Sequence, residues 1–277
     1  MDTYELILVD RPADFVNRIT LNRPEKRNAL NNQLRGEILD CLTKADLDDS
    51  IRVTIIRGSG KAFSAGYDLG SDLSSGQPFH TAQGLGFWPR QVTEGWMRIM
   101  DLAKPTIAQV HGYCLAGGSE LATACDLVYV GESTRFGYPA TRSISPPDMQ
   151  FHPWLVGLRA SMELMLTGDS VTGEEAVSLG FANRMFPDDS LDAEVIKQAE
   201  RVAKIPPDIQ QINKRSVHRA MEIMGMRAAM RSGTEMQALA EQTASSIAFG
   251  EALANSVTGA FQDRDEKFGD GRTAKDQ

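Results

Sequence analysis

Two glycine-centred turns are the segments of this sequence best suited to chemistry. One is AFSAGYDL at residues 62–69 and the other is HGYCLAGGSELA at residues 111–122, and each follows an apolar run. Glycine lets the backbone approach a ligand closely, and a helix that opens at the second turn adds the positive end of its dipole. Two such turns can direct backbone N–H groups at one point, which is the geometry of an oxyanion hole for a reacting carbonyl group.

Other chemistries that glycine, serine or cysteine could suggest fail on spacing. Residues 58–61 read GSGK, but the first glycine and the final Ser or Thr of a nucleotide-binding P-loop are absent. Ser64 and Ser119 each lack one of the two glycines of the hydrolase motif G-x-S-x-G. His111, Cys114 and Cys125 have no fourth partner at a spacing that suits zinc. The sequence therefore predicts neither a P-loop nor a serine hydrolase, and no metal site.

The composition is that of a globular protein with an acidic balance. Of the 277 residues, 42% are hydrophobic and 24% are charged, and 29 Lys and Arg against 37 Asp and Glu give a formal charge of −8. Such a chain has no general basic field to attract nucleic acid or an anionic membrane. The odd number of cysteines, the charged N-terminal segment and the lack of a membrane-length apolar run predict a cytoplasmic protein with reduced thiols.

Extended and helical patterns alternate through the first half of the chain. Residues 4–21 predict a hairpin of two strands, and the polar, glycine-dotted segment 58–86 predicts a loop. The apolar runs VTIIRG, TIAQVHG and DLVYVG predict buried strands, whereas residues 32–47 and 92–102 predict helices. This alternation favours an α/β core.

The C-terminal third has a different pattern. From about Leu155 onward the periodicity predicts almost pure helix, and the methionines between Met221 and Met236 predict core or subunit contacts. The polar tail GDGRTAKDQ predicts a frayed end.

Four blocks, in this order and spacing, resemble the crotonase (enoyl-CoA hydratase) superfamily: NRPEKRNALN, AFSAGYDL, HGYCLAGGSELATACDLVYV and ELMLTGDSVTGEEAVSLGFANRMFP. The resemblance implies an α/β fold of the ClpP/crotonase type, a spiral of strand-strand-helix units in residues 1–205 that holds the acyl-CoA site. It implies a helical trimerisation region in residues 206–277 that covers the coenzyme pocket, with trimers or dimers of trimers. Coenzyme A is then part of the substrate, and no metal or other cofactor is expected.

The resemblance also implies roles for individual residues. The backbone N–H groups of Tyr67 and Gly117 resemble the two oxyanion donors. Residues expected to meet coenzyme A are Arg23, Lys26, Arg27, Ala29, Ser64, Ala65, Gly66 and Asp68, with Phe261 and Lys267 closing the adenine pocket from the same or a neighbouring subunit. Residues expected to line the acyl pocket are Tyr138, Ala140, His152 and Trp154, and residues 70–95 are expected to cover it.

One position departs from the family pattern. Glu120 matches the first catalytic glutamate of enoyl-CoA hydratases, but the segment FGYPA has Ala140 where those enzymes carry the second. Because alanine cannot transfer a proton, another group must serve, and Asp148 lies where some relatives carry a working carboxylate. We expect Glu120 and Asp148 to divide the roles of base and acid, with Phe151 and Trp154 among the apolar neighbours that keep one of them protonated.

Three functions remain open on this basis. The first is a lyase that adds water to an enoyl-CoA thioester, or removes it, through an enolate held in the oxyanion hole. The second is an enoyl- or dienoyl-CoA isomerase or an acyl-CoA hydrolase that uses Glu120 and Asp148. The third is a catalytically weak acyl-CoA-binding protein, which the retention of Glu120 and of both glycine turns disfavours.

Overall fold

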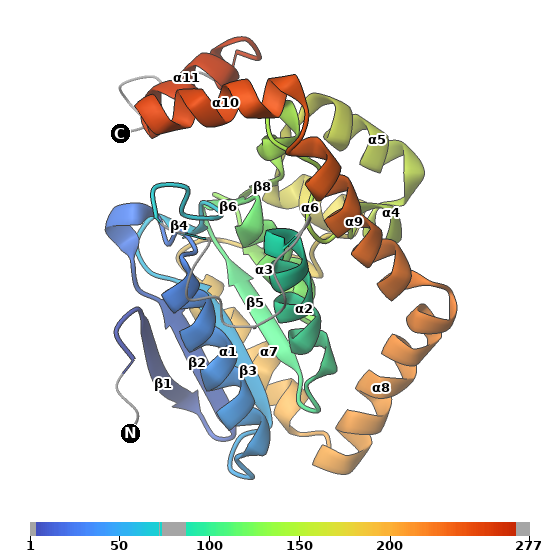
Figure 1. Cartoon of the computed structure of the whole chain (residues 1–277). Coiled ribbons are helices and arrows are strands. Elements are labelled where there is room, and N and C mark those ends of the chain that lie inside the picture. Colours follow the sequence, from blue (N-terminus) through green and yellow to red (C-terminus); the bar gives the residue numbers. More distant parts are fainter. Residues whose placement is uncertain (1–3, 72, 74–86, 270–277) are drawn as a thin grey trace.

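The strands form two sheets, and from β3 to β8 successive strands alternate between them (Figure 1). The computed structural model describes residues 4–71, 73 and 87–269. Within them the larger sheet has the strand order β1-β2-β3-β5-β7-β10 and the smaller one the order β4-β6-β8-β9. The larger sheet consists of β1 (Ile7–Ala13), β2 (Val16–Leu21), β3 (Val53–Gly58), β5 (Thr106–Val110), β7 (Leu127–Gly131) and β10 (Arg184–Phe186). The smaller sheet consists of β4 (Ala62–Ser64), β6 (Tyr113–Leu115), β8 (Arg135–Gly137) and β9 (Ser170–Thr172).

The larger sheet begins with a hairpin and continues with parallel strands. β1 and β2 are antiparallel, with Ile7 opposite Leu21, whereas β2, β3, β5, β7 and β10 run parallel to one another. The predicted hairpin is thus confirmed, and the chain reverses just after Ala13, where Phe15 takes a positive φ of 62°. Parallel strands are covered on both faces, which is why VTIIRG is a continuous apolar run rather than an alternating one.

Successive pairs of strands form a spiral. β3 leads into β4, β5 into β6 and β7 into β8, and each pair gives one strand to either sheet. Helix α2 (Phe87–Asp101) follows β4, and helix α3 (Gly117–Ala124) follows β6. This repeated order is the predicted crotonase-type spiral. Because β4 and β6 are parallel neighbours, the glycine turns that follow them come to the same edge of the smaller sheet.

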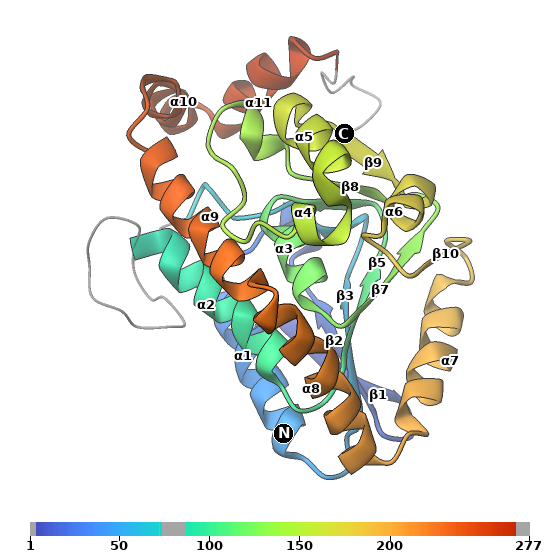
Figure 2. The same ribbon diagram turned by 90° about the vertical axis from the view of Figure 1, so that its right-hand side faces the viewer.

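Helices cover both faces of the larger sheet (Figures 1 and 2). Helix α1 (Asn32–Leu47), α2 and α3 lie on one face, and α7 (Leu191–Ala203) packs on the other against a separate apolar cluster around Val53 and Val195. Helix α1 begins at the predicted residue 32. The side chain of Asn31 caps it by accepting a hydrogen bond from the Leu34 N–H at 2.8 Å.

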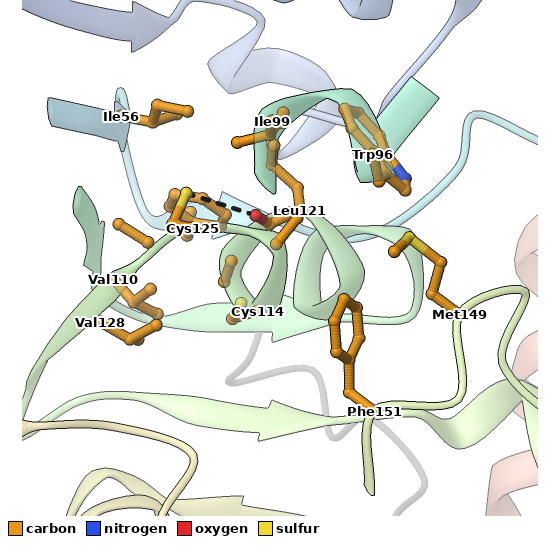
Figure 3. Close-up of a cluster of buried hydrophobic side chains, with 14 of the residues drawn as sticks. Ile56, Trp96, Ile99, Val110, Cys114, Leu121, Cys125, Val128, Met149 and Phe151 are labelled. Atoms are coloured by element: carbon orange, nitrogen blue, oxygen red, sulfur yellow. Dashed lines mark hydrogen bonds between the residues drawn. The ribbon is translucent and has the colours of Figure 1, made fainter. Parts of the chain in front are cut away.

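The main core surrounds α3 (Figure 3). Trp96, Met149 and Phe151 gather at one end of this cluster, close to the helix that carries Leu121. Cys114 and Cys125 lie in the same core, and all three cysteines of the chain are buried and free of disulfides. The apolar core thus packs against α3, the helix that carries Glu120.

The second half of the chain is less uniformly helical than predicted. Its helices are α4 (His152–Leu155), α5 (Gly157–Thr167), α6 (Gly173–Leu179), α7, α8 (Pro207–Ile223), α9 (Met226–Ala240), α10 (Ala244–Asn255) and α11 (Val257–Glu266). However, β9 and β10 interrupt them, and they exist because they pair with β8 and β7 from earlier in the chain. Similarly, β4 lies inside the predicted loop 58–86, and α2 begins before the predicted residue 92.

Of the C-terminal helices, α9 packs on the spiral, whereas α10 and α11 contact chiefly each other. In both views α9 runs beside α2, and the hairpin of α10 and α11 lies near α5 (Figures 1 and 2). Met226 and Met230 are buried in the main core, whereas Met224 and Met236 are exposed, so the methionines divide between core and surface. Most of the predicted covering segment and the predicted frayed tail lie outside the described residues. None of the described helices is long and apolar enough to cross a membrane.

Candidate active site

The two glycine turns touch each other directly. A Cβ on Gly66 would lie 3.0 Å from the Leu115 carbonyl oxygen and 3.5 Å from the Gly117 nitrogen. A Cβ on Gly117 would lie 2.5 Å from the Cζ atom of the Tyr67 ring. Only glycine fits at these approaches, so the turns that carry Tyr67 and Gly117 are in direct contact.

Backbone geometry aims the start of α3 at this contact. Ala116, the residue before the helix, has φ 48° and ψ −122°, a conformation that costs a non-glycine residue about 1–3 kcal/mol. Gly118 has no room for a side chain, because a Cβ there would lie 2.6 Å from the Ser64 carbonyl oxygen. Strain and close packing together fix the direction of the first N–H groups of α3, including that of Gly117.

The segment before α1 runs alongside the first glycine turn. The N–H of Leu30 donates to the Gly66 oxygen at 2.8 Å, and the N–H of Asp68 donates to the Leu30 oxygen at 3.1 Å. Further along, the N–H of Ala65 donates to the Arg27 oxygen at 2.9 Å. Two sequence blocks about 35 residues apart are therefore joined, which brings together the residues expected to meet coenzyme A.

The charged residues of the segment before α1 have different surroundings. Arg23 donates to the Ala29 carbonyl oxygen at 2.6 Å and pairs with Asp68 at 2.9 Å. These bonds fasten the segment to the glycine turn. Lys26, at the end of the 3₁₀ turn Pro24–Lys26, is exposed, and the Arg27 guanidinium lies 5.8 Å from the centre of the Tyr113 ring.

Ser64 is a buried part of the turn rather than a surface group. Its hydroxyl donates to the Asn28 carbonyl oxygen at 2.8 Å and accepts from the Gly66 N–H at 3.2 Å. Ser64 therefore holds the turn in shape and joins it to the preceding segment.

Glu120 lies in the first turn of α3 and is 2 % exposed. One carboxylate oxygen accepts a short hydrogen bond from the Tyr67 hydroxyl, and the other accepts from the Met149 N–H at 3.2 Å. Burial raises the pKa of Glu120 to about 7, although hydrogen bonds from Tyr67, Met149, Asp148 and Tyr138 oppose the shift. A carboxyl group with this pKa can exchange a proton near neutral pH.

Asp148 lies beside Glu120 and is 1 % exposed. Burial, and then the charge of Glu120, raise the pKa of Asp148 well above its usual range, while Arg35 opposes the shift. Within the described residues, Asp148 Oδ1 has no hydrogen-bond partner. The structure therefore brings together the two carboxyl groups that the sequence analysis paired.

Tyr138 is the one expected acyl-pocket residue with a direct tie to the carboxyl groups, among those the structure describes. It is buried directly after β8, and its side chain is among the groups that lower the pKa of Glu120 against the effect of burial. Ala140 follows in the 3₁₀ turn Pro139–Arg142 and is also buried. The position of the second glutamate thus lies in the site wall but offers only a methyl group.

His152 and Trp154 lie in the short helix α4. The His152 ring packs edge-on against Phe181, with ring centres 5.3 Å apart, and its Nδ1 lies 2.8 Å from Gln150 Oε1. Burial lowers the pKa of His152 to about 4, so the ring is neutral at pH 7. Trp154 is partly buried against the main core.

The two residues expected to close the adenine pocket lie on or after α11. Phe261 packs against Phe249 of α10 with ring centres 5.9 Å apart, and the Arg264 guanidinium lies 4.8 Å from the centre of the Phe261 ring. Lys267 is exposed at the end of α11. Within this chain both belong to the hairpin of α10 and α11.

Sequence reasoning missed two groups of the site. Trp96 on α2 donates from Nε1 to the Tyr67 hydroxyl at 3.0 Å, and Arg35 on α1 is fully buried with its guanidinium 5.6 Å from the centre of the Trp96 ring. A signal for Arg35 exists, because it shares the i, i+3, i+4, i+7 face of α1 with Ile38, Leu39 and Leu42. An arginine in the middle of an apolar helical face indicates a buried charge.

Known proteins match the chain over most of its length. The family model for enoyl-CoA hydratase/isomerase matches residues 13–257. A putative enoyl-CoA hydratase of Mycobacterium tuberculosis is 37% identical over 231 residues, covering 76% of this chain and 73% of the relative. The 2,3-dehydroadipyl-CoA hydratase of Escherichia coli is 34% identical, covering 74% of this chain and 79% of the relative.

Solved structures agree with this assignment. An enoyl-CoA hydratase/isomerase from Xanthobacter autotrophicus Py2 has a TM-score of 0.87 and 35% identity, covering 96% of this chain and 99% of that one. An enoyl-CoA hydratase from Mycobacterium smegmatis has a TM-score of 0.88 and 28% identity, covering 97% of this chain and 96% of that one. With the two glycine turns in contact and a buried glutamate beside them, the chain belongs to the enoyl-CoA hydratase/isomerase family and is an enzyme of the hydratase type that acts on acyl-CoA.

Proposed function

We propose that this enzyme adds water across the C2–C3 double bond of a 2-enoyl-CoA thioester and catalyses the reverse dehydration. The observation that carries the proposal is the position of the Glu120 carboxyl group, in the first helical turn beside the contact of the two glycine turns. In this proposal the N–H groups of Tyr67 and Gly117 hold the thioester oxygen. Gly117 is the first residue of α3, so its N–H has no acceptor within the helix.

Glu120 is the proposed base. It removes a proton from water as the water oxygen bonds to C3, and the negative charge moves to the thioester oxygen as an enolate. Donors aimed at such an oxygen contribute about 3–4 kcal/mol each to the lowering of the barrier. The pKa of about 7 supports this role, since Glu120 is then substantially ionised at neutral pH and still basic enough to accept the proton.

Asp148 is the proposed acid. It delivers its proton to C2, which completes the addition of one water molecule, and it regains a proton when Glu120 loses one. Its burial and raised pKa support a protonated resting state. Oδ1, which has no hydrogen-bond partner among the described residues, is available for such a transfer.

Contacts to coenzyme A are proposed along the two joined blocks. Lys26 and Arg27 are proposed to meet the phosphates, because Lys26 is exposed and Arg27 stands on the same turn. Arg23 and Asp68 are proposed to support that surface through their ion pair. The groups of Ser64, Ala65 and Gly66 are proposed to meet the adenine, with Phe261 and Lys267 closing the pocket. No resident cofactor or metal is part of this proposal, since coenzyme A arrives with the substrate.

Double-bond isomerisation is the second candidate function. It is favoured by one specific observation, namely that Ala140 replaces the second glutamate while a buried Asp148 is present. In that reaction one carboxyl group removes a proton from the acyl chain and the other returns a proton elsewhere on it, with no net addition of water.

Mass spectrometry of the products distinguishes these functions. The enzyme is mixed with straight-chain, branched and aromatic 2-enoyl-CoA thioesters in isotopically labelled water, with Glu120→Gln as control. A product that gains one labelled water and keeps its coenzyme supports the hydratase. An unchanged mass apart from exchanged hydrogen supports an isomerase, free acid and coenzyme support a hydrolase, and a tight complex without turnover supports a binding protein.

We further propose a cytoplasmic homotrimer or dimer of trimers, with residues 206–277 as the trimerisation region. Exposed apolar side chains on α8 support an association surface, namely Ile209, Ile212, Val217 and Ile223. Light scattering coupled to size-exclusion chromatography tests the assembly, and a monomer at working concentration would rule it out.

A further inference from the structure

A buried arginine lies behind the two carboxyl groups. The side chain of Arg35 is 0 % exposed, on the face of α1 that also buries Ile38 and Leu42. A guanidinium group remains protonated at all ordinary pH values. Enclosing such a cation is strongly unfavourable unless a negative charge compensates it. The position of Arg35 therefore demands an anion nearby.

Contacts fix the guanidinium group in relation to Glu120. Its Nη1 donates to Asn32 Oδ1 at 3.2 Å, and its central carbon lies 5.6 Å from the centre of the Trp96 ring. Trp96 in turn donates to the Tyr67 hydroxyl, and that hydroxyl donates to Glu120. Arg35 thus stands at one end of a row of contacts whose other end is the proposed base.

Ionisable groups from several elements surround this row. They are Tyr67 after β4, Glu120 on α3, Tyr138 after β8, Asp148 before α4 and Glu241 after α9. Among the described groups whose charge acts on Asp148, Arg35 is the cation, whereas Glu120 and Glu241 are anions.

We propose that Arg35 is a positioning residue that holds the net charge of the Glu120–Asp148 pair at −1. The two carboxyl groups then share a single proton when the substrate arrives. The inference rests on the proposed function, which needs one ionised and one protonated carboxyl group. One carboxylate neutralises Arg35. A second would leave an uncompensated buried anion, and loss of the first would leave Arg35 uncompensated.

The wild-type enzyme provides the first test. Infrared difference spectra of the carboxylic acid C=O stretch are recorded at pH 8.5, above the pKa of about 7 of Glu120, with Glu120→Gln and Asp148→Asn to assign the bands. The expected result is one protonated carboxyl group in the pair. Two protonated groups, or none, would overturn the inference even if no variant of Arg35 folds.

Substitution of Arg35 provides the second test. In Arg35→Met both carboxyl groups are expected to be protonated at pH 7, so kcat/KM for hydration falls about tenfold or more at that pH and recovers as the pH rises, because the ionised base needs higher pH. Arg35→Lys keeps the charge and is expected to keep the pH midpoint near that of the wild type. A purely structural role would lower kcat/KM equally at every pH.

A matched control uses a second arginine with carboxylate partners, which is nearly as buried as Arg35. Arg18 on β2 pairs with Asp10 and Asp192, and its side chain is 11% exposed. Arg18→Met is expected to lose stability without moving the pH midpoint. An unchanged midpoint and proton count in Arg35→Met would overturn the role of Arg35 while leaving the hydratase assignment intact. Wild-type enzyme that carries one shared proton but does not hydrate any thioester would instead count against the proposed function.

Discussion

The main-chain oxygen of Asp148 lies so close to Gly233 of α9 that a Cβ on the glycine would be 2.8 Å away from it. The Pro147 oxygen stands at the same distance from that position. From the neighbouring helix α2, the Thr93 hydroxyl donates to the Asp148 oxygen at 3.0 Å and lies 2.7 Å from the Thr234 hydroxyl oxygen. Helices α2 and α9 therefore hold the loop that carries one of the two buried carboxyl groups.

Gly233→Ala is expected to displace this loop. The added methyl group meets backbone oxygens that cannot rotate away, so overpacking costs about 1–3 kcal/mol of unfolding free energy, against a gain of about 1 kcal/mol in helix propensity. The displaced Asp148 carboxyl is expected to lower kcat about tenfold or more, because misplacement by an ångström already costs this much. Stopped-time product assays and denaturant unfolding measure the two effects.

Gly250→Ala is the matched control for that substitution. Gly250 lies within α10, and nothing lies within 4 Å of a Cβ built there. The same chemical change is expected to raise the unfolding free energy by about 0.5–1 kcal/mol and to leave kcat unchanged. If the two variants behave alike, close packing of α9 on the Asp148 loop does not shape the site.

Glu120→Gln is expected to abolish most of the activity while leaving the fold intact. The amide keeps the shape of the side chain but cannot take a proton from water, so kcat falls by about 10²–10⁴. In the wild type, kcat/KM is expected to rise through a midpoint near pH 7, following the pKa of Glu120. A pH–rate profile measured from pH 5 to pH 9 checks the midpoint, and a flat profile would remove Glu120 from the role of base.

The same carboxyl group makes stability depend on pH. Burial raises the pKa of Glu120 from 4.5 to about 7, so between these values the folded state binds a proton that the unfolded state has lost. The contribution of Glu120 to the free energy of unfolding is therefore greatest below about pH 4.5. About 3 kcal/mol of that contribution is lost once the pH has risen to 7 or above.

Thermal unfolding of wild type and Glu120→Gln tests this sign. The variant cannot ionise, so its Tm relative to wild type is expected to increase between pH 5 and pH 8. The opposite trend would mean that the folded state stabilises the charged form of Glu120.

The sequence was sufficient for most of the fold because local patterns and tertiary contacts agree there. The hairpin of β1 and β2, helix α1 with its Asn31 cap, and the apolar strand β3 all follow from local patterns. The sequence analysis did not predict β4, β9 and β10, because each has three residues and is defined by its partner strand rather than by its own periodicity. A strand that short carries no reliable alternation.

The site was predictable where it depends on glycine or on the family resemblance, and was not where it depends on contacts between residues far apart in the sequence. Gly66 and Gly117 mark close approaches that only glycine permits, so the meeting of the two turns could be inferred. The apolar face that Arg35 shares with Ile38 and Leu42 signals its burial, but the Trp96 ring beside its guanidinium group lies about 60 residues later in the sequence. Contacts between such distant residues leave no local pattern.

Asp148→Asn is expected to separate proton delivery from binding. Asparagine fits the same space but cannot supply a proton to C2, so kcat is expected to fall by about 10² or more, with KM nearly unchanged, because the coenzyme contacts lie elsewhere. Asp169→Asn serves as control, since the Asp169 side chain is 61% exposed, and the kcat of this variant should match that of the wild type. Steady-state kinetics with a 2-enoyl-CoA are the measurement, and full turnover by Asp148→Asn would show that a group other than Asp148 delivers the proton to C2.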